Sequence, residues 1–109
     1  MSRRYDLQKE LEKHADNVYF QPPSTIKMTY PCVVYNKISK FKEYGNDQAY
    51  IKIQGYSVTV MYRDPDSLIA DDLEDHFTHC AITQYFTNDN IHHTVLELYY
   101  QEEIINGNT

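Results

Sequence analysis

Residues 17–35 read NVYFQPPSTIKMTYPCVVY, and this stretch decides how the first half of the chain folds. Its VYF run, residues 18–20, predicts a short strand, which the next two prolines must end because proline has no N–H to donate to a sheet. A polar loop then leads to Pro31, which fits the first position of a long strand of alternating side chains reaching about residue 38. The stretch contains no recognisable reactive cluster, so it specifies a shape and not an active site.

The residues before this stretch predict a helix from about residue 2 or 3 to Ala15. Leu7, Leu11 and Ala15 recur at four-residue spacing and form one apolar stripe, while charged residues occupy the other face. Pairs of surface charges on such a helix contribute only tenths of a kcal/mol. Burial of the apolar stripe is therefore expected to hold the helix on the domain.

A long β-hairpin is predicted next. The charged segment 40–48 contains the turn signal YGND, and a strand returns over residues 50–62. Apolar side chains of this strand change parity at Gly55, from positions 51 and 53 before it to positions 56, 58 and 60 after it. Either a β-bulge at Gly55 or the use of both sheet faces would explain the change.

We expect this hairpin to project as an arm of about residues 38–56. Its base would join the core, and its tip would present Ile51 and Ile53 to another subunit. The alternative is an ordinary bulged strand that stays within the domain.

The second half of the chain predicts a helix and then another pair of strands. Asp64 is the expected helix N-cap, with Pro65 at the first helical position and Asp66 near the positive end of the helix dipole. Residues 81–86 and 91–100 predict two strands around a four-residue polar turn, TNDN.

Together these segments predict one α+β domain, an antiparallel sheet with two helices packed on it in the order α-β-β-β-α-β-β. The domain is expected to span residues 1–102, and residues 103–109 to form a C-terminal tail. At 109 residues, with 41% hydrophobic and 24% charged residues, the chain has the size and composition of a single folding domain.

The charge of the chain limits its partners. Sixteen Asp and Glu against ten Lys and Arg give a net charge of −6, which argues against sequence-specific DNA binding through a basic face. An acidic ring around a channel would still let DNA slide through without binding. Eleven tyrosines favour strands and contact surfaces, because the ring is apolar while its hydroxyl can stay hydrated.

The sequence also indicates the compartment. It has no run of roughly 20 apolar residues, and its charged N-terminus lacks the apolar core of a signal peptide. We therefore expect no membrane contact and a product that stays in the cytosol. There, Cys32 and Cys80 are expected to be reduced, buried thiols and not a disulfide.

Histidines and carboxylates are the candidates for chemistry. His76 and His79 could meet on one helical face, but cationic residues are also favoured at a helix C-terminus, and adjacent strand residues such as His92 and His93 point to opposite faces. The acidic residues of segment 64–75 are explained more simply as caps and a solvated helix face. We expect no catalytic residue, metal site or cofactor; a small metal-binding protein or hydrolase is the alternative.

Three segments carry a family resemblance: residues 17–35 quoted above, YRDPDS at residues 62–67 and LELYY at residues 96–100. Together they resemble small neck proteins of tailed bacteriophages, the tail-completion, tail-terminator or minor structural proteins. The resemblance is weakest over residues 37–53.

This resemblance implies a virion structural protein that forms a ring, usually a hexamer, on the finished tail tube. The implied partners are other copies of the chain, the tail tube protein and a head–tail connector protein, with DNA passing through the lumen. The implied location is the neck of the virion, after assembly in the host cytoplasm. A head-side connector of the same neck, a stopper or adaptor, is the alternative.

A ring subunit needs edge strands, protruding arms and apolar surface that assembly covers. We expect such contacts in the arm and in the first loop, and ordinary packing is the alternative for each residue. The expected contact residues are Tyr44, Tyr50, Ile51, Lys52 and Ile53 in the arm, and Phe20, Pro22 and Pro23 in the loop.

Overall fold

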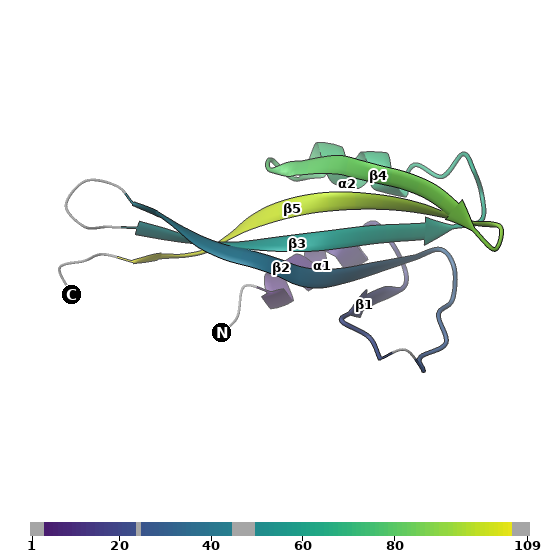
Figure 1. Ribbon diagram of the computed structural model, residues 1–109, viewed down its shortest axis with the longest axis horizontal. Coiled ribbons are helices and arrows are strands. Elements are labelled where there is room, and N and C mark those ends of the chain that lie inside the picture. The colour runs from purple at the N-terminus through teal and green to yellow at the C-terminus, as the bar shows by residue number, and fades with distance from the viewer. Residues whose placement is uncertain (1–3, 24, 45–49, 106–109) are drawn as a thin grey trace.

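The computed structural model describes residues 4–23, 25–44 and 50–105. Two helices and five strands follow one another along the chain: α1 (Arg4–Glu12), β1 (Val18–Phe20), β2 (Cys32–Tyr44), β3 (Tyr50–Tyr62), α2 (Ile69–His76), β4 (Cys80–Asn88) and β5 (Ile91–Ile105). The strands form a single sheet in the order β1-β2-β3-β5-β4, and both helices lie on the same face of it (Figure 1). The predicted α+β class is therefore confirmed.

The sheet is mixed, so the prediction of a purely antiparallel sheet is wrong at one edge. β1 pairs in parallel with β2, with Val18 opposite Val33, while the other three pairings are antiparallel. The polar loop of residues 21–31 makes this possible, because it carries the chain back to the start of β2 before the next strand begins. Parallel neighbours need such a crossover, whereas antiparallel neighbours need only a tight turn.

The core lies between the helices and one face of the sheet. Leu7 and Leu11 of α1 and Leu73 of α2 are fully buried against Val58 and Leu96 of the two central strands. The predicted apolar stripe of α1 is confirmed, although α1 ends at Glu12 and Ala15 is buried just beyond it. Burial of these aliphatic side chains, each stabilising by roughly 1.5–3 kcal/mol, holds both helices on the sheet.

The parity change in β3 is resolved by the register of the sheet. The pairings of β3 have two irregularities, and both lie in the strands beside it. One is between Lys37 and Ser39 of β2, and the other is in β5, opposite the step from Lys52 to Ile53. Because β3 itself alternates without interruption, Ile51 and Ile53 lie on the face opposite Val58. The strand uses both faces, which was one of the two alternatives.

Three of the strands continue well beyond the helices. β1 pairs with β2 only as far as Tyr35, and β4 pairs with β5 only as far as Leu98, but β3 remains paired on both sides as far as Tyr50. We call residues 38–44, 50–55 and 99–105 the three-strand extension (Figure 1). It makes the molecule elongated, 53 × 26 × 21 Å. Its radius of gyration is 15.6 Å, against about 13 Å for a compact domain of this length.

The extension corrects two details of the sequence prediction. The charged segment expected to be a turn from residue 40 is strand as far as Tyr44, and the remainder of that turn, 45–48, lies outside the described residues. Glu103–Ile105, expected to begin a tail, belong to β5 and pair with β3. Residues 106–109 of the expected tail lie outside the described residues.

Two local predictions in the second half are wrong. Asp64 does not cap α2, which begins five residues later at Ile69; instead its side chain accepts the N–H of Asp66 at 3.0 Å and closes a separate turn. This is the local hydrogen bond by which Asp competes with helix formation. The β4–β5 turn has only Asp89 and Asn90 at its centre, both with positive φ, the geometry of a two-residue hairpin turn.

Candidate interaction surface

The histidines are engaged by neighbouring side chains. His76 Nε2 lies 2.9 Å from Glu10 Oε2 and joins α2 to α1. His92 stacks on Tyr62, and His93 lies parallel to the ring of Phe86 with centroids 4.6 Å apart. Tyr62 belongs to the buried core, so the two histidines point to opposite faces of β5, as predicted. Within the described parts of the chain, no group of three or more His, Cys, Asp or Glu residues could hold a metal ion.

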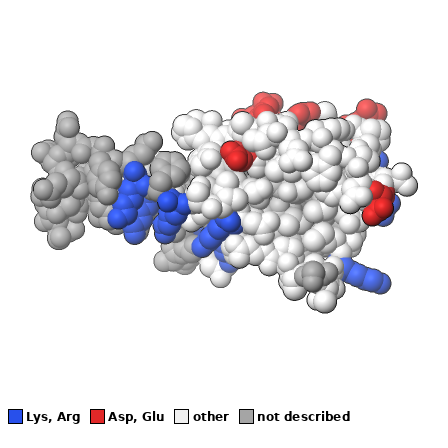
Figure 2. Space-filling view, viewed as in Figure 1, with Lys and Arg blue, Asp and Glu red and all other residues white. Residues whose placement is uncertain are grey.

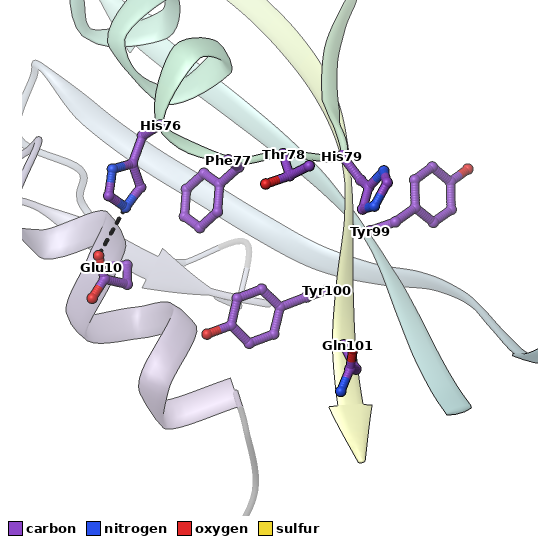
Figure 3. A pocket seen from close by; sticks show the side chains of 8 residues that line it. All are labelled: Glu10, His76, Phe77, Thr78, His79, Tyr99, Tyr100 and Gln101. Atoms are coloured by element: carbon purple, nitrogen blue, oxygen red, sulfur yellow. Dashed lines mark hydrogen bonds and ion pairs between the residues drawn. The ribbon is translucent and has the colours of Figure 1, made fainter. Parts of the chain in front are cut away.

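A pocket of about 330 Å³ lies where α1, α2 and β5 meet (Figure 3). The ring of Tyr100 points towards α1, while that of Tyr99 lies on the other side of β5 beside His79. The lining residues are Glu10, His76, Phe77, Thr78, His79, Tyr99, Tyr100 and Gln101. The ion pair within it joins the two helices, and hydrogen bonds from Lys13 and then His76 hold the pKa of Glu10 below its usual value. The pocket is best described as a junction between helices.

Both cysteines are free thiols, as predicted. Cys32 is buried and Cys80 half-buried, and burial raises the pKa of each to about 11. Since the thiolate is the nucleophilic form, neither side chain is activated for covalent chemistry at neutral pH.

The predicted contact residues lie in two separate regions. Phe20 is engaged within the domain: its ring packs on Tyr35 with centroids 4.9 Å apart, and the Arg4 guanidinium lies 4.3 Å from its centroid. Pro22 is half-buried and Pro23 exposed. The loop thus offers less free surface than the sequence suggested.

The arm residues lie on the three-strand extension. Ile51, Lys52 and Ile53 are half-buried in its central strand. Tyr44 and Tyr50 pair across β2 and β3 at the end of the described ladder, and their side chains lie outside the described structure. The structure therefore places all five arm residues in one region, which is separate from the region of the loop residues.

The sheet face opposite the helices contains few charges. In the view of Figure 2, which looks onto this face, Lys and Arg are seen at the extension, and Asp and Glu lie mainly along the edge above α2 and β4. Uncharged side chains such as Thr59 and Val95 occupy its middle, and Glu97 is the carboxylate that interrupts it. Both helices of the described structure lie on the other face, so no described helix covers this one.

Strand β4 is an exposed edge strand that the sequence analysis did not identify as a candidate contact surface. It forms one edge of the sheet, and every residue from Ala81 to Asn88 is exposed, including Ile82, Tyr85 and Phe86. Its sequence CAITQYFTN contains no charged residue and no proline, the devices that usually protect edge strands from pairing with other chains. The absence of both from a predicted strand was the available signal.

The other sheet edge is protected. β1 is only three residues long, and Pro22 and Pro23 follow it closely. A short strand and nearby prolines both prevent further pairing. The edge formed by β1 is therefore closed, whereas the edge formed by β4 is open.

No family model matches this chain, and no curated protein matches it either. Within residues 4–23, 25–44 and 50–105, no helix is long and apolar enough to span a membrane.

Proposed function

We propose that this chain is a structural protein of the bacteriophage neck, a ring subunit that completes the tail tube and joins it to the head. The placement in the neck is supported by the resemblance of residues 17–35, 62–67 and 96–100 to tail-completion and tail-terminator proteins. The ring would be a hexamer, with DNA passing through its lumen without sequence-specific binding.

The observation that supports assembly is the uncovered edge strand β4, whose exposed backbone and aromatic side chains are suited to a contact with another chain. The three-strand extension supports it further, because it projects beyond the core and displays Ile51 and Ile53. Such surfaces are typical of subunits that complete their packing only on assembly.

A head-side connector of the same neck is the second candidate, because its subunits would need the same kind of surface. The partner distinguishes the two. A tail-completion protein binds the end of the tail tube, whereas a stopper or adaptor binds the portal side.

The test is the mass of the purified protein by light scattering, alone and with tail tube protein, with negative-stain images of the species formed. Rings, alone or on tube ends, are the expected result. Binding to a portal adaptor but not to tubes would favour the connector, and a monomer that ignores both would contradict the proposal.

A paired variant tests the contribution of the extension. Lys52→Glu with Ile53→Asp should leave a folded monomer and abolish ring formation. Lys27→Glu with Ile26→Asp makes the same chemical change at exposed residues of the first loop and should assemble normally. Circular dichroism of both variants separates lost assembly from lost folding, and equal assembly of both would exclude the extension as a contact.

A further inference from the structure

The open part of the β4 edge can be located from its hydrogen bonds. In a two-residue hairpin the two residues that flank the turn, here Asn88 and Ile91, are hydrogen-bonded to each other. Along an antiparallel ladder, pairs with and without hydrogen bonds then alternate. Tyr85 and Thr87 therefore direct their N–H and C=O groups away from β5. Ile82 also directs its N–H outward, but there the Glu74 carboxylate accepts it at 3.0 Å. The first part of β4 is thus occupied by α2, and residues 83–88 form an open edge.

The charge beside this open edge is negative. α2 lies against β4 and exposes Asp71, Asp72 and Asp75. These carboxylates are on the helix-bearing face of the sheet, next to the edge strand. A strand that pairs with β4 would therefore be favoured if it placed positive charge on that same face.

The chain itself contains such a strand. The N–H of Lys37 donates to Gln21 Oε1, and beyond this residue the described part of the chain pairs with β2 on one side only, through β3. In the register of the sheet, Lys40 lies opposite Gln54 and Lys42 lies opposite Lys52. Positions 52 and 54 of β3 are on the same face as Val58, which is the face that carries the helices. The outer edge of β2 in the extension therefore carries lysines on the helix-bearing face. If the sheet continued into a second copy, these lysines would lie on the same face as the α2 helix of that copy.

We propose that a second copy of this chain adds its β2 edge, residues 38–44, to the open β4 edge, residues 83–88, so that the sheet continues from one subunit to the next. The inference rests on the proposed ring and identifies the contact that would build it. β2 and β4 lie on opposite sides of the sheet order, so each subunit can use both edges at once. Such a head-to-tail contact builds a ring when its rotation closes.

Pairing of two β4 edges is disfavoured by charge. Pairing β4 with the β4 of a second copy would bring two α2 helices and their exposed carboxylates together. Like charges at such distances destabilise a cross-strand contact.

Two variants that each disable one edge test the proposal. Thr87→Pro removes an N–H that points away from β5, so the internal ladder is retained while the β4 edge is blocked. Tyr85→Lys is a second β4 variant that needs no backbone change. Lys40→Glu with Lys42→Glu disables the β2 edge, and Lys9→Glu with Lys27→Glu is its control, with the same change in net charge at exposed sites elsewhere.

Light scattering and sedimentation measure the assemblies, alone and on tail tubes. The wild type and the Lys9/Lys27 control should form the same rings. The β4 variants and the Lys40/Lys42 variant should each remain monomers of about 12.9 kDa, with contacts weakened about tenfold or more. Mixing Thr87→Pro with the Lys40/Lys42 variant should give one-to-one dimers, because only one intact β2 edge and one intact β4 edge are then present.

Three results would overturn the inference: dimers of the Lys40/Lys42 variant alone, rings from all edge variants, or a wild type that is monomeric alone and on tubes. Failure of the proposed function gives a different pattern. Rings that are lost in the edge variants but do not bind tail tubes would support the β2–β4 contact and refute the neck role. Rings that form on tube ends in every edge variant would support the neck role and refute this contact.

Discussion

Gly55 lies at a crowded point of the sheet face opposite the helices. A Cβ built there would lie 2.8 Å from Ser39 Oγ, 3.1 Å from Tyr99 Cε1 and 3.2 Å from Ile38 Cγ1. Tyr99 is its cross-strand partner, so the tyrosine ring occupies the space that a side chain would need. An aromatic ring placed beside a strand glycine in this way compensates for its missing side chain.

We predict that Gly55→Val lowers the free energy of unfolding by about 1–3 kcal/mol, since valine would force Tyr99 and Ile38 out of position. Strand propensity alone predicts the opposite sign, because valine favours strands and glycine does not. Urea unfolding followed by circular dichroism measures the change.

Ser57→Val is the matched control for this substitution. Ser57 lies two residues further along β3 on the same face and is half-buried. It should change stability by no more than about 0.5 kcal/mol. A Gly55→Val variant as stable as this control would show that Tyr99 can move without penalty.

At the scale of elements, β3 and β5 are joined by a buried polar contact. The hydroxyls of Tyr62 and Thr94 lie 2.9 Å apart, and the two residues are 5% and 3% exposed. A buried hydroxyl that loses its partner retains its desolvation penalty, so removing one side of the pair is worse than removing both.

We therefore predict that Tyr62→Phe and Thr94→Val each destabilise the protein by about 1 kcal/mol. The double variant should be less destabilised than the sum of the two, with a coupling energy of about 0.5–1 kcal/mol. Thermal or urea unfolding of all four proteins completes the cycle. Additive effects would mean that the two hydroxyls do not stabilise the contact.

The sequence predicted those elements whose pattern is local. Alternation and turn signals located β1, β3 and β5, and the four-residue spacing of Leu7 and Leu11 located α1. The start of α2 was missed because Asp64 can cap a helix or close a turn, and only the packing of Leu73 decides between them.

Features that depend on pairing between segments far apart in the chain could not be predicted from the sequence. Nothing local to residues 18–20 states that β1 runs parallel to β2, or that β5 follows β3 to Tyr50. The open edge at β4 was missed for the same reason: whether a strand is at an edge depends on sheet order, and only its lack of charge and proline was visible beforehand.

At the scale of the whole molecule, the described lysines and carboxylates gather on different parts of the surface. Lysines lie on the extension, and carboxylates lie along α2 beside β4 (Figure 2). With a net charge of −6, two copies repel each other at long range, so attraction depends on bringing these two regions together. In the proposed contact, charge would thus set the orientation and the open edge would supply the backbone pairing.

This separation predicts how assembly responds to salt. Raising NaCl from 0.05 to 0.5 M should lower the fraction of wild-type rings, because screening shortens the Debye length to a few ångströms and weakens lysine–carboxylate attraction more than backbone pairing. Sedimentation velocity at fixed protein concentration measures that fraction. The Lys9/Lys27 control should show the same salt dependence as the wild type, and the Lys40/Lys42 variant should remain a monomer at both salt concentrations. Rings that become more abundant with salt would instead show that apolar burial or net repulsion outweighs lysine–carboxylate attraction, and would contradict an orientation set by charge.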